Sequence, residues 1–196
     1  MGKQIKHLLR YFLGLDPANS QTTQAERLAL SRHVVGRRLV AEIGVFEGLT
    51  SAFLARAMAT DGVLYAIDPF FPGRLGICWG KWIARQELRK VRPRRRVVFI
   101  EQLSCEALSQ VEGQLDFLFI DGDHSLEAIK RDWADWSPHM AAGGIIALHD
   151  TRVPAHNPRV AEFGSHQYFE SHIRHDGRFE ILEQVDSLSV LQRKKS

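Results

Sequence analysis

The sequence is poor in cysteine and contains no long apolar run. Only two of its 196 residues are cysteines, Cys78 and Cys105. Two thiols cannot build a disulfide framework or a four-thiolate metal site, so we expect a reducing compartment, the cytoplasm. The longest purely apolar stretch, Met140 to Leu148, has nine residues including two glycines, whereas a membrane-spanning helix needs about 20. The sequence therefore predicts no transmembrane helix.

The composition also lacks strong bias. Hydrophobic residues make up 44% and charged residues 25% of the chain, which argues against disorder, collagen-like repeats and coiled coil. The length fits one compact domain, because domains typically take about 100 to 200 residues. We predict a single domain over residues 37–196, preceded by a helical extension over residues 1–36.

The beginning of the chain has the pattern of an amphipathic helix. No small-residue cleavage pattern follows it, so it is not predicted to be a signal peptide. Such a helix packs on its own domain, across a dimer interface or on a membrane surface. We expect it to cover the domain or to form a homodimer, with peripheral membrane contact as the alternative. Its apolar residues are Ile5, Leu8, Leu9, Phe12 and Leu13, and its basic and imidazole residues are Lys3, Lys6, His7 and Arg10.

Charge is concentrated locally. The net charge is only +3, yet the segment from Lys81 to Arg96 holds eight basic residues against one acid, Glu87. Because Trp82 is its only aromatic residue, the segment lacks the interleaved aromatics that stack on nucleic-acid bases. We interpret it as a solvated helix end and turn, and we expect no nucleic-acid partner.

Short apolar strands alternate with helical segments along the chain. Near-continuous apolar strands in five β-then-α units predict a parallel sheet with helices on both faces. The fold class is therefore a doubly wound α/β fold with a C-terminal antiparallel hairpin. The expected strands are 39–45, 63–67, 97–100, 115–120, 144–148, 179–183 and 188–192, and the expected helices after the first strand are 49–59, 80–91, 104–111, 125–136 and 160–169.

Glycines and an acid follow the first two predicted strands, where ligands bind in such sheets. The first strand runs into Glu42-Ile-Gly44-Val-Phe-Glu-Gly48, a turn in which glycines let the backbone approach a ligand. The second ends at Asp68, 20 residues after Gly48, a spacing at which a carboxylate accepts the ribose hydroxyls of an adenosine cofactor. A tight strand-to-helix turn without a ligand is the alternative.

Acids and imidazoles follow the fourth and fifth predicted strands. The fourth ends in Asp121-Gly-Asp123-His124 and the fifth in His149-Asp150-Thr151. Neighbouring parallel strands lie about 5 Å apart, so Asp121 and Asp150 are expected to share one cation or one proton. The alternatives are a helix N-cap for Asp123 and hydrogen bonds to loop amides for the other two acids.

These motifs resemble class I S-adenosylmethionine-dependent methyltransferases, in particular the small branch (methyltransferase family 24) that methylates hydroxyl groups of sugars and natural products. The resemblance spans Val40 to Thr151 and lies in AEIGVFEGLTS, YAIDPF, FLFIDGDHSLEAIKRD and GGIIALHDT. It implies a Rossmann-like fold, S-adenosylmethionine as cofactor and a small-molecule acceptor. The cofactor contacts that it implies are Glu42, Gly44, Gly48, Asp68, Glu101, Ser104 and Asp121.

The same resemblance implies a catalytic centre at Asp121 and His124, with His124 as general base. Magnesium-dependent relatives carry acids that correspond to Asp121 and Asp150, but this chain has His149 where a second oxygen ligand is usual. Because magnesium prefers oxygen ligands, His149 weakens the expectation of Mg²⁺ at the set Asp121, Asp150 and His149, or shifts it toward Mn²⁺. The alternative is metal-free catalysis by His124 as general base, with Asp121 orienting its ring. We also expect residues 69–80 to form a lid over the acceptor, with a packed loop as the alternative.

Three other functions are weighed. A nicotinamide enzyme would use the glycine turn and Asp68, but G-x-G-x-x-G is absent because Phe46 stands where its second glycine would be. A metal-dependent hydrolase would use Asp121, His124, His149 and Asp150 and would leave the glycine turn unexplained. The third alternative is a catalytically silent binding or dimerisation module.

Overall fold

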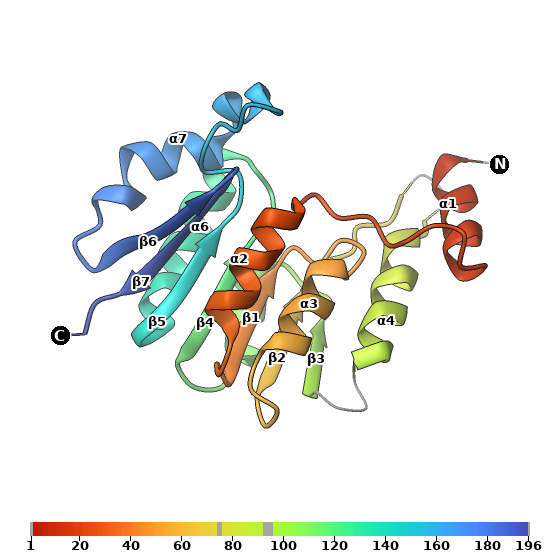
Figure 1. Ribbon diagram of the computed structural model, residues 1–196, viewed down its shortest axis with the longest axis horizontal. Helices are drawn as coiled ribbons and strands as arrows, with labels where there is room; N and C mark the ends of the chain where they lie inside the picture. Colours follow the sequence, from red (N-terminus) through yellow and green to blue (C-terminus); the bar gives the residue numbers. More distant parts are fainter. Residues whose placement is uncertain (1, 74–75, 92–95, 196) are drawn as a thin grey trace.

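The computed structural model describes residues 2–73, 76–91 and 96–195 and places one seven-stranded sheet at the centre of the molecule (Figure 1). The strand order is β3-β2-β1-β4-β5-β7-β6. The first five strands are parallel, while β7 is antiparallel to both β5 and β6. This topology confirms the predicted doubly wound fold with its C-terminal hairpin. The strands are β1 Leu39–Ile43, β2 Val63–Ile67, β3 Arg96–Ile100, β4 Leu115–Ile120, β5 Met140–Leu148, β6 Phe179–Val185 and β7 Leu188–Arg193.

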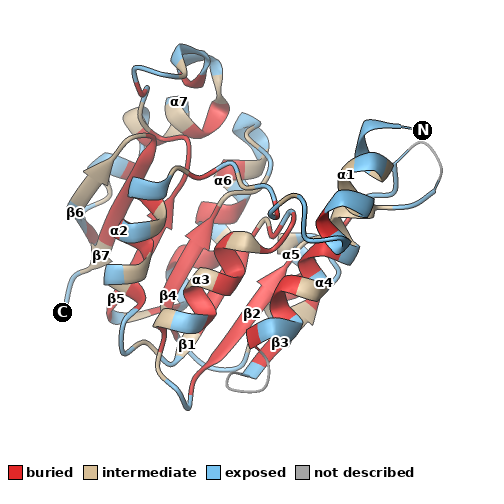
Figure 2. Cartoon of the chain, turned by 45° about the vertical axis from the view of Figure 1, so that its right-hand side comes forward, coloured by how far each residue is buried: buried red, intermediate tan, exposed pale blue. Residues whose placement is uncertain are grey.

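Helices cover both faces of the sheet. Two hydrophobic cores result, one under α2, α3 and α4 and one under α6 and α7, and burial is deepest along the strands between them (Figure 2). This arrangement explains why β2 is apolar throughout: each of its residues is buried. The helices are α1 Lys3–Phe12, α2 Gln24–Val34, α3 Leu49–Ala57, α4 Trp79–Val91, α5 Ser104–Ala107, α6 Leu126–Trp136 and α7 Gly164–Ser171.

One predicted helix is divided in two. Residues 160–169 were expected to form a single helix, but a 3-10 turn, Pro158–Glu162, precedes α7, and Phe163 between them is extended. Tertiary packing accounts for the break, because a Cβ on Gly164 would lie 2.1 Å from the backbone nitrogen of Leu126. Strand β5 also begins four residues earlier than predicted, at Met140 rather than Gly144.

The N-terminal segment packs on its own domain. The Tyr11 hydroxyl donates to Glu87 Oε1 on α4 at 2.6 Å, and Lys90 Nζ donates to the Tyr11 oxygen at 3.1 Å. The other side of α1 leaves Leu9, Phe12 and Leu13 exposed. Within the described ranges, no helix has both the length and the apolar character that crossing a membrane requires.

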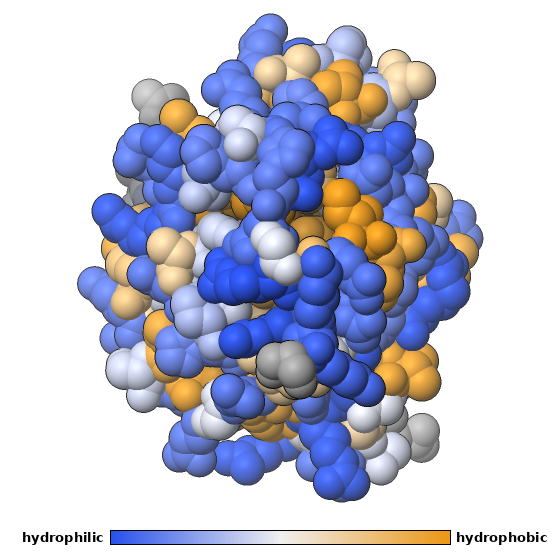
Figure 3. All heavy atoms as spheres, turned by 90° about the vertical axis from the view of Figure 1, so that its left-hand side faces the viewer, coloured by the Kyte–Doolittle hydropathy of each residue, from blue (hydrophilic) through white to orange (hydrophobic). Residues whose placement is uncertain are grey.

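The charges of the Lys81–Arg96 segment are only partly described. Lys81 and Arg85 form ion pairs with Glu101, and Lys90 pairs with Glu87. The arginines at positions 92, 94 and 95 lie outside the described residues. On the face that carries the edge strand β6, hydrophilic side chains predominate and hydrophobic ones form small separate groups (Figure 3).

Candidate active site

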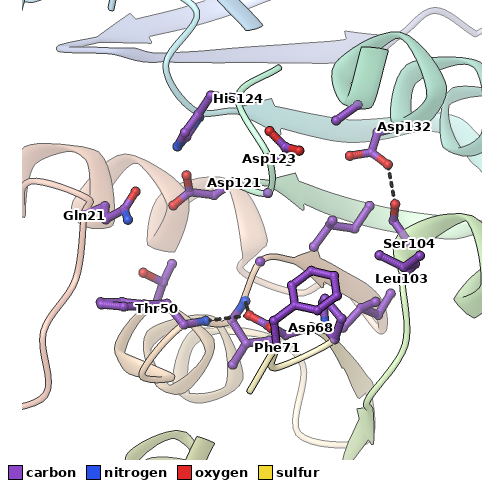
Figure 4. A pocket seen from close by; sticks show the side chains of 18 of the residues that line it. Gln21, Thr50, Asp68, Phe71, Leu103, Ser104, Asp121, Asp123, His124 and Asp132 are labelled. Atoms are coloured by element: carbon purple, nitrogen blue, oxygen red, sulfur yellow. Dashed lines mark hydrogen bonds between the residues drawn. The ribbon is translucent and has the colours of Figure 1, made fainter. Parts of the chain in front are cut away.

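A cavity of about 550 Å³ opens at the carboxyl ends of β1, β2 and β4 (Figure 4). Its walls come from the turns after these strands, from residues 102–105 after β3, from α6 and from the N-terminal residues 19–21. Of the sequence-predicted site residues, the cavity brings together Gly44, Asp68, Ser104, Asp121 and His124. This is the edge of the sheet at which the strand-end rule places a ligand.

Gly44 is required by a close backbone approach. Its φ is 91°, and a Cβ there would lie 2.0 Å from the backbone oxygen of Asp121. The turns after β1 and β4 therefore meet only because this position has no side chain. Gly48 does not line the cavity. It precedes α3 at a φ of 77°, and a Cβ there would lie 2.9 Å from Ala84 Cα, so this glycine lets α3 pack on α4.

Asp68 holds the glycine turn in place. Its Oδ2 accepts hydrogen bonds from the backbone nitrogens of Val45 and Phe46, both at 2.9 Å, and its Oδ1 accepts one from Phe70 at 2.7 Å. A carboxylate has about four acceptor sites, so Asp68 keeps acceptor capacity for a ligand while it shapes the turn.

Glu42 lies beneath the turn rather than in the cavity. Its side chain is fully buried on β1, and its carboxyl oxygens have no hydrogen-bond partner among the described residues. Burial raises the pKa of Glu42 well above its ordinary value, and the nearby carboxylates of Asp121 and Asp68 raise it further. The fold therefore disfavours the charged form of this carboxyl.

The segment after β3 contributes Ser104 but not Glu101. Ser104 Oγ donates to Asp132 Oδ1 on α6 at 2.5 Å, and both residues line the cavity. Burial raises the pKa of Asp132 to about 6, although the hydrogen bond from Ser104 opposes that shift. Glu101 lies outside the cavity, where Lys81 and Arg85 hold its carboxylate.

His149 is surrounded by carboxylates below the cavity. Its Nδ1 lies 3.0 Å from Asp121 Oδ1 and 3.5 Å from Asp150 Oδ2. Its Nε2 lies 3.3 Å from Glu26 Oε2. Burial alone would lower the pKa of His149, but the surrounding carboxylates raise it well above its ordinary value. The surrounding carboxylates therefore favour the charged form of the ring.

His124 lies at the mouth of the cavity and is oriented by two neighbours. Its Nδ1 is 3.4 Å from Asp150 Oδ2, and its ring stacks on Phe163 with centroids 5.0 Å apart. Asp121 was expected to orient this ring if catalysis were metal-free, but Asp150 occupies that position. Burial would raise the pKa of Asp150, yet His149 and His124 together lower it below its ordinary value.

Asp123 does not cap α6, contrary to one alternative considered for it. The N-cap is Ser125, whose side chain accepts from the backbone nitrogen of Ala128. Asp123 Oδ1 instead accepts from the backbone nitrogen of Ser125 at 2.8 Å, an Asx turn that places His124.

The arrangement does not fit the predicted metal set. Among the described residues, no group of three or more His, Cys, Asp or Glu side chains is arranged to hold a metal ion. Oxygens of Glu26, Asp121 and Asp150 lie within 3.5 Å of the His149 ring nitrogens, although Nδ1 and Asp121 Oδ1 make no aligned hydrogen bond among the described residues.

Sequence reasoning missed two contributors to the site. The Thr23-x-x-Glu26 pattern predicts a capping box, which the structure confirms, but the Glu26 carboxylate also reaches His149. The N-terminal residues Asn19, Ser20 and Gln21 line the cavity. Their polar, irregular sequence carries no periodic signal that would have revealed this.

Comparisons with known proteins identify the family of the domain. A sequence model of the family described as "Methyltransferase domain" matches residues 41–151. The uncharacterized protein y4gI of Sinorhizobium fredii is 24% identical over 142 residues, which cover 70% of this chain. The chain spans only about 15% of the length of that relative.

Solved structures share the fold. An O-methyltransferase from Bacillus cereus in complex with SAH (S-adenosylhomocysteine) has a TM-score of 0.64 and 20% identity, and the match covers 99% of this chain and 92% of that chain. An rRNA methylase from Streptococcus thermophilus has a TM-score of 0.61 and 14% identity, with coverage of 90% and 100%. At such identities the likeness establishes the fold and leaves the acceptor open.

Proposed function

Because the chain belongs to the family of methyltransferase domains, we propose that it transfers a methyl group from S-adenosylmethionine to a hydroxyl group of a small molecule. The observation that carries this proposal is the cavity in which Gly44, Asp68, Asp121 and His124 meet at the strand ends. Its volume of about 550 Å³ lies within the range typical of small-molecule sites.

The residues of the cavity suit an adenosyl cofactor. The Gly44 turn allows close backbone approach, and the remaining acceptor capacity of Asp68 serves the ribose hydroxyls. Ser104, in the segment 102–105 after β3, is hydrogen-bonded to Asp132 on α6, and the two form a polar end wall of the cavity. Asp121 lies next to Gly44. Together with His124 it lines the end of the cavity that we assign to the acceptor.

His124 acts as the general base. S-adenosylmethionine, when bound, supplies an electrophilic methyl group on a sulfonium. As the acceptor oxygen bonds to the methyl carbon, the carbon–sulfur electron pair stays on sulfur and the hydroxyl proton passes to His124. Asp150, 3.4 Å from Nδ1, orients the ring, and no hydrogen bond among the described residues engages Nε2. Such proton transfer contributes typically 10²–10⁴-fold to rate.

The acceptor is a sugar or natural-product hydroxyl rather than a nucleic acid. The N-terminal residues 19–21 and Phe71 form part of the cavity wall, and a walled cavity suits a small acceptor better than a nucleic-acid strand. The Lys81 and Arg85 charges, which would meet a phosphate backbone, are already paired with Glu101. Both cysteines are free, and we place the protein in the cytoplasm.

Calorimetry with S-adenosylmethionine, S-adenosylhomocysteine and NAD tests the cofactor assignment. We expect micromolar-range binding of the two adenosyl compounds and none of NAD. Asp68→Ala should weaken binding on the order of 10-fold or more, because hydrogen bonds to charged groups contribute about 1.5–3 kcal/mol.

Asp116→Ala is the matched control for Asp68→Ala. Asp116 Oδ2 also accepts two backbone hydrogen bonds, from Arg38 and Leu39, but at the opposite end of the sheet. Both variants loosen a turn, and only the first should affect the cofactor. Equal cofactor affinity in folded wild type and Asp68→Ala would refute the assignment. Binding without transfer to any hydroxyl in a panel of sugars, phenols and oligoribonucleotides would favour the silent binding module.

A further inference from the structure

We infer that the side chain of His149 takes the place of a divalent cation between Asp121 and Asp150, so that methyl transfer at this site needs no metal. The inference rests on the proposed function only for the reaction itself. The arrangement of charges is a property of the folded chain and is tested without turnover.

Three carboxylates converge on one imidazole ring. Asp121 and Asp150 approach Nδ1 at 3.0 and 3.5 Å, and Glu26 approaches Nε2 at 3.3 Å. The side chains are 4% exposed for His149, 1% for Glu26, 11% for Asp121 and 8% for Asp150. Water therefore screens these interactions only weakly, and one positive charge on the ring would offset part of the negative charge of the three carboxylates.

The charges around the ring exclude it as a metal ligand. A neutral imidazole has one N–H and one lone pair, whereas an imidazolium donates from both nitrogens. Nε2 is hydrogen-bonded to Glu26, while Nδ1 lies within 3.5 Å of Asp121 and Asp150 without an aligned hydrogen bond to either among the described residues. A neutral ring would therefore set its lone pair beside two negative charges, so the ring carries two protons and no lone pair is left for a metal ion.

Glu26 is the residue that fixes this orientation. Its Oε1 accepts from the backbone nitrogen and the hydroxyl of Ser187, at 2.9 and 2.6 Å, while its Oε2 accepts from the Thr23 backbone at 2.7 Å. The carboxylate thus cannot rotate away from His149. Glu26 and His149 act as positioning residues, because neither lines the cavity.

The consequence reaches the general base through Asp150. Asp150 Oδ2 faces both His149 Nδ1 and His124 Nδ1, at 3.5 and 3.4 Å. A permanent positive charge at position 149 keeps Asp150 ionised and in place, as a bound cation would. It does so while Asp121 remains at the cavity floor beside the cofactor turn.

Metal-binding calorimetry with Mn²⁺ and Mg²⁺ tests the inference on chelator-treated protein. The wild type should bind neither ion stoichiometrically, and its turnover should be the same with and without chelator. The double variant Glu26→Gln/His149→Asp removes the internal cation and leaves three carboxylates without burying an unpaired Glu26. It should gain one Mn²⁺ site at least tenfold tighter than any wild-type binding. His139→Asp, at an exposed histidine, is the matched control and should gain none.

Nitrogen NMR of the histidine rings provides a readout that needs no variant to fold. Both His149 nitrogens should be protonated at pH 7. A stoichiometric Mn²⁺ site in the wild type that Asp150→Asn abolishes would overturn the inference, as would a neutral His149 ring at pH 7. Failure of S-adenosylmethionine binding would refute the proposed function and leave these two readouts interpretable.

Discussion

Asp132 is a buried carboxyl whose charge the fold disfavours. Its pKa is raised to about 6 from 3.8, mainly by burial. The folded state therefore binds the proton more tightly, so this residue destabilises the fold as pH rises through about 6. Asp132→Asn keeps an acceptor for Ser104 and should stabilise the ligand-free protein at pH 8 by up to about 3 kcal/mol.

Urea unfolding at pH 8 and pH 5 measures this effect. At pH 5 the gain should fall to roughly half, because the wild-type carboxyl is then mostly protonated in the folded state. Asp135→Asn on the same helix serves as the control. Destabilisation by Asp132→Asn at both pH values would mean that the ionised carboxylate is stabilised at this position.

The charged form of Glu26 stabilises the fold, in contrast to that of Asp132. Burial alone would raise its pKa, but His149, Ser187 and Thr23 lower it to about 2 from 4.5. Its contribution to stability is therefore present above pH 4.5 and is lost as pH falls toward 2. Glu26→Gln should destabilise the protein by on the order of 2–3 kcal/mol at pH 7 and much less at pH 3.

Thermal unfolding at pH 7 and pH 3 checks that prediction. Glu127→Gln is the control, because Glu127 is also in the first turn of a helix but its side chain is 83% exposed. A Glu26→Gln penalty that is the same at both pH values would show that the loss comes from packing and not from charge.

At the scale of single residues, the sequence predicts which residues lie at strand ends better than it predicts which residues distant in the sequence contact each other. Asp68 and Asp121 follow strands, so their place at the sheet edge depends on local sequence alone. Glu26 is fully accounted for by its local capping box, and its contact with His149 joins residues 123 positions apart. No local pattern encodes such a pair, which is why His149 was expected to be a metal ligand.

At the scale of elements, the turn between β1 and α3 depends on Gly44. Gly44→Ala would place a Cβ 2.0 Å from the backbone oxygen of Asp121, so the turns after β1 and β4 must separate. We expect a loss of more than about 2 kcal/mol in unfolding free energy and loss of S-adenosylhomocysteine binding.

Gly36→Ala distinguishes the cost of a positive φ from the cost of a steric clash with the Cβ. Gly36 also has a positive φ, 75°, but open space around its Cβ position, so its substitution should cost only about 1 kcal/mol and leave cofactor binding intact. Chemical denaturation and calorimetry on both variants decide the matter. Equal effects of the two substitutions would contradict a specific contact between the turns.

Element boundaries were predictable where periodicity is local. Strands β2 and β4 match their predicted bounds, because each is a short apolar run between polar turns. The break at Phe163 was not predictable, since it arises from the close packing of Gly164 on Leu126. That break has a role in the site, because it lets Phe163 stack on His124.

At the scale of the whole molecule, α1 leaves Leu9, Phe12 and Leu13 exposed at 48%, 53% and 72%. We predict that a second copy of the chain covers this face, because a two-fold dimer buries the same patch on both subunits. Light scattering at micromolar concentration should report a dimer for the wild type and a monomer for Leu9→Glu/Leu13→Glu. Lys3→Glu on the same helix is the control, and a monomeric wild type would contradict the prediction.

The hydrogen bond between Glu26 and Ser187 can form only late in the synthesis of the chain. The two residues are 161 positions apart, so α2 leaves the ribosome long before the β6–β7 hairpin does. Until the chain is complete, Glu26 lacks its full set of partners, Ser187 and His149. The N-terminal residues 19–21 are then not held against the cavity. A contact between residues so far apart forms late in folding, because the chain between them must first lose conformational entropy. A nascent chain halted before residue 179 should therefore be cleaved by protease within residues 13–23, whereas the released chain should be protected there.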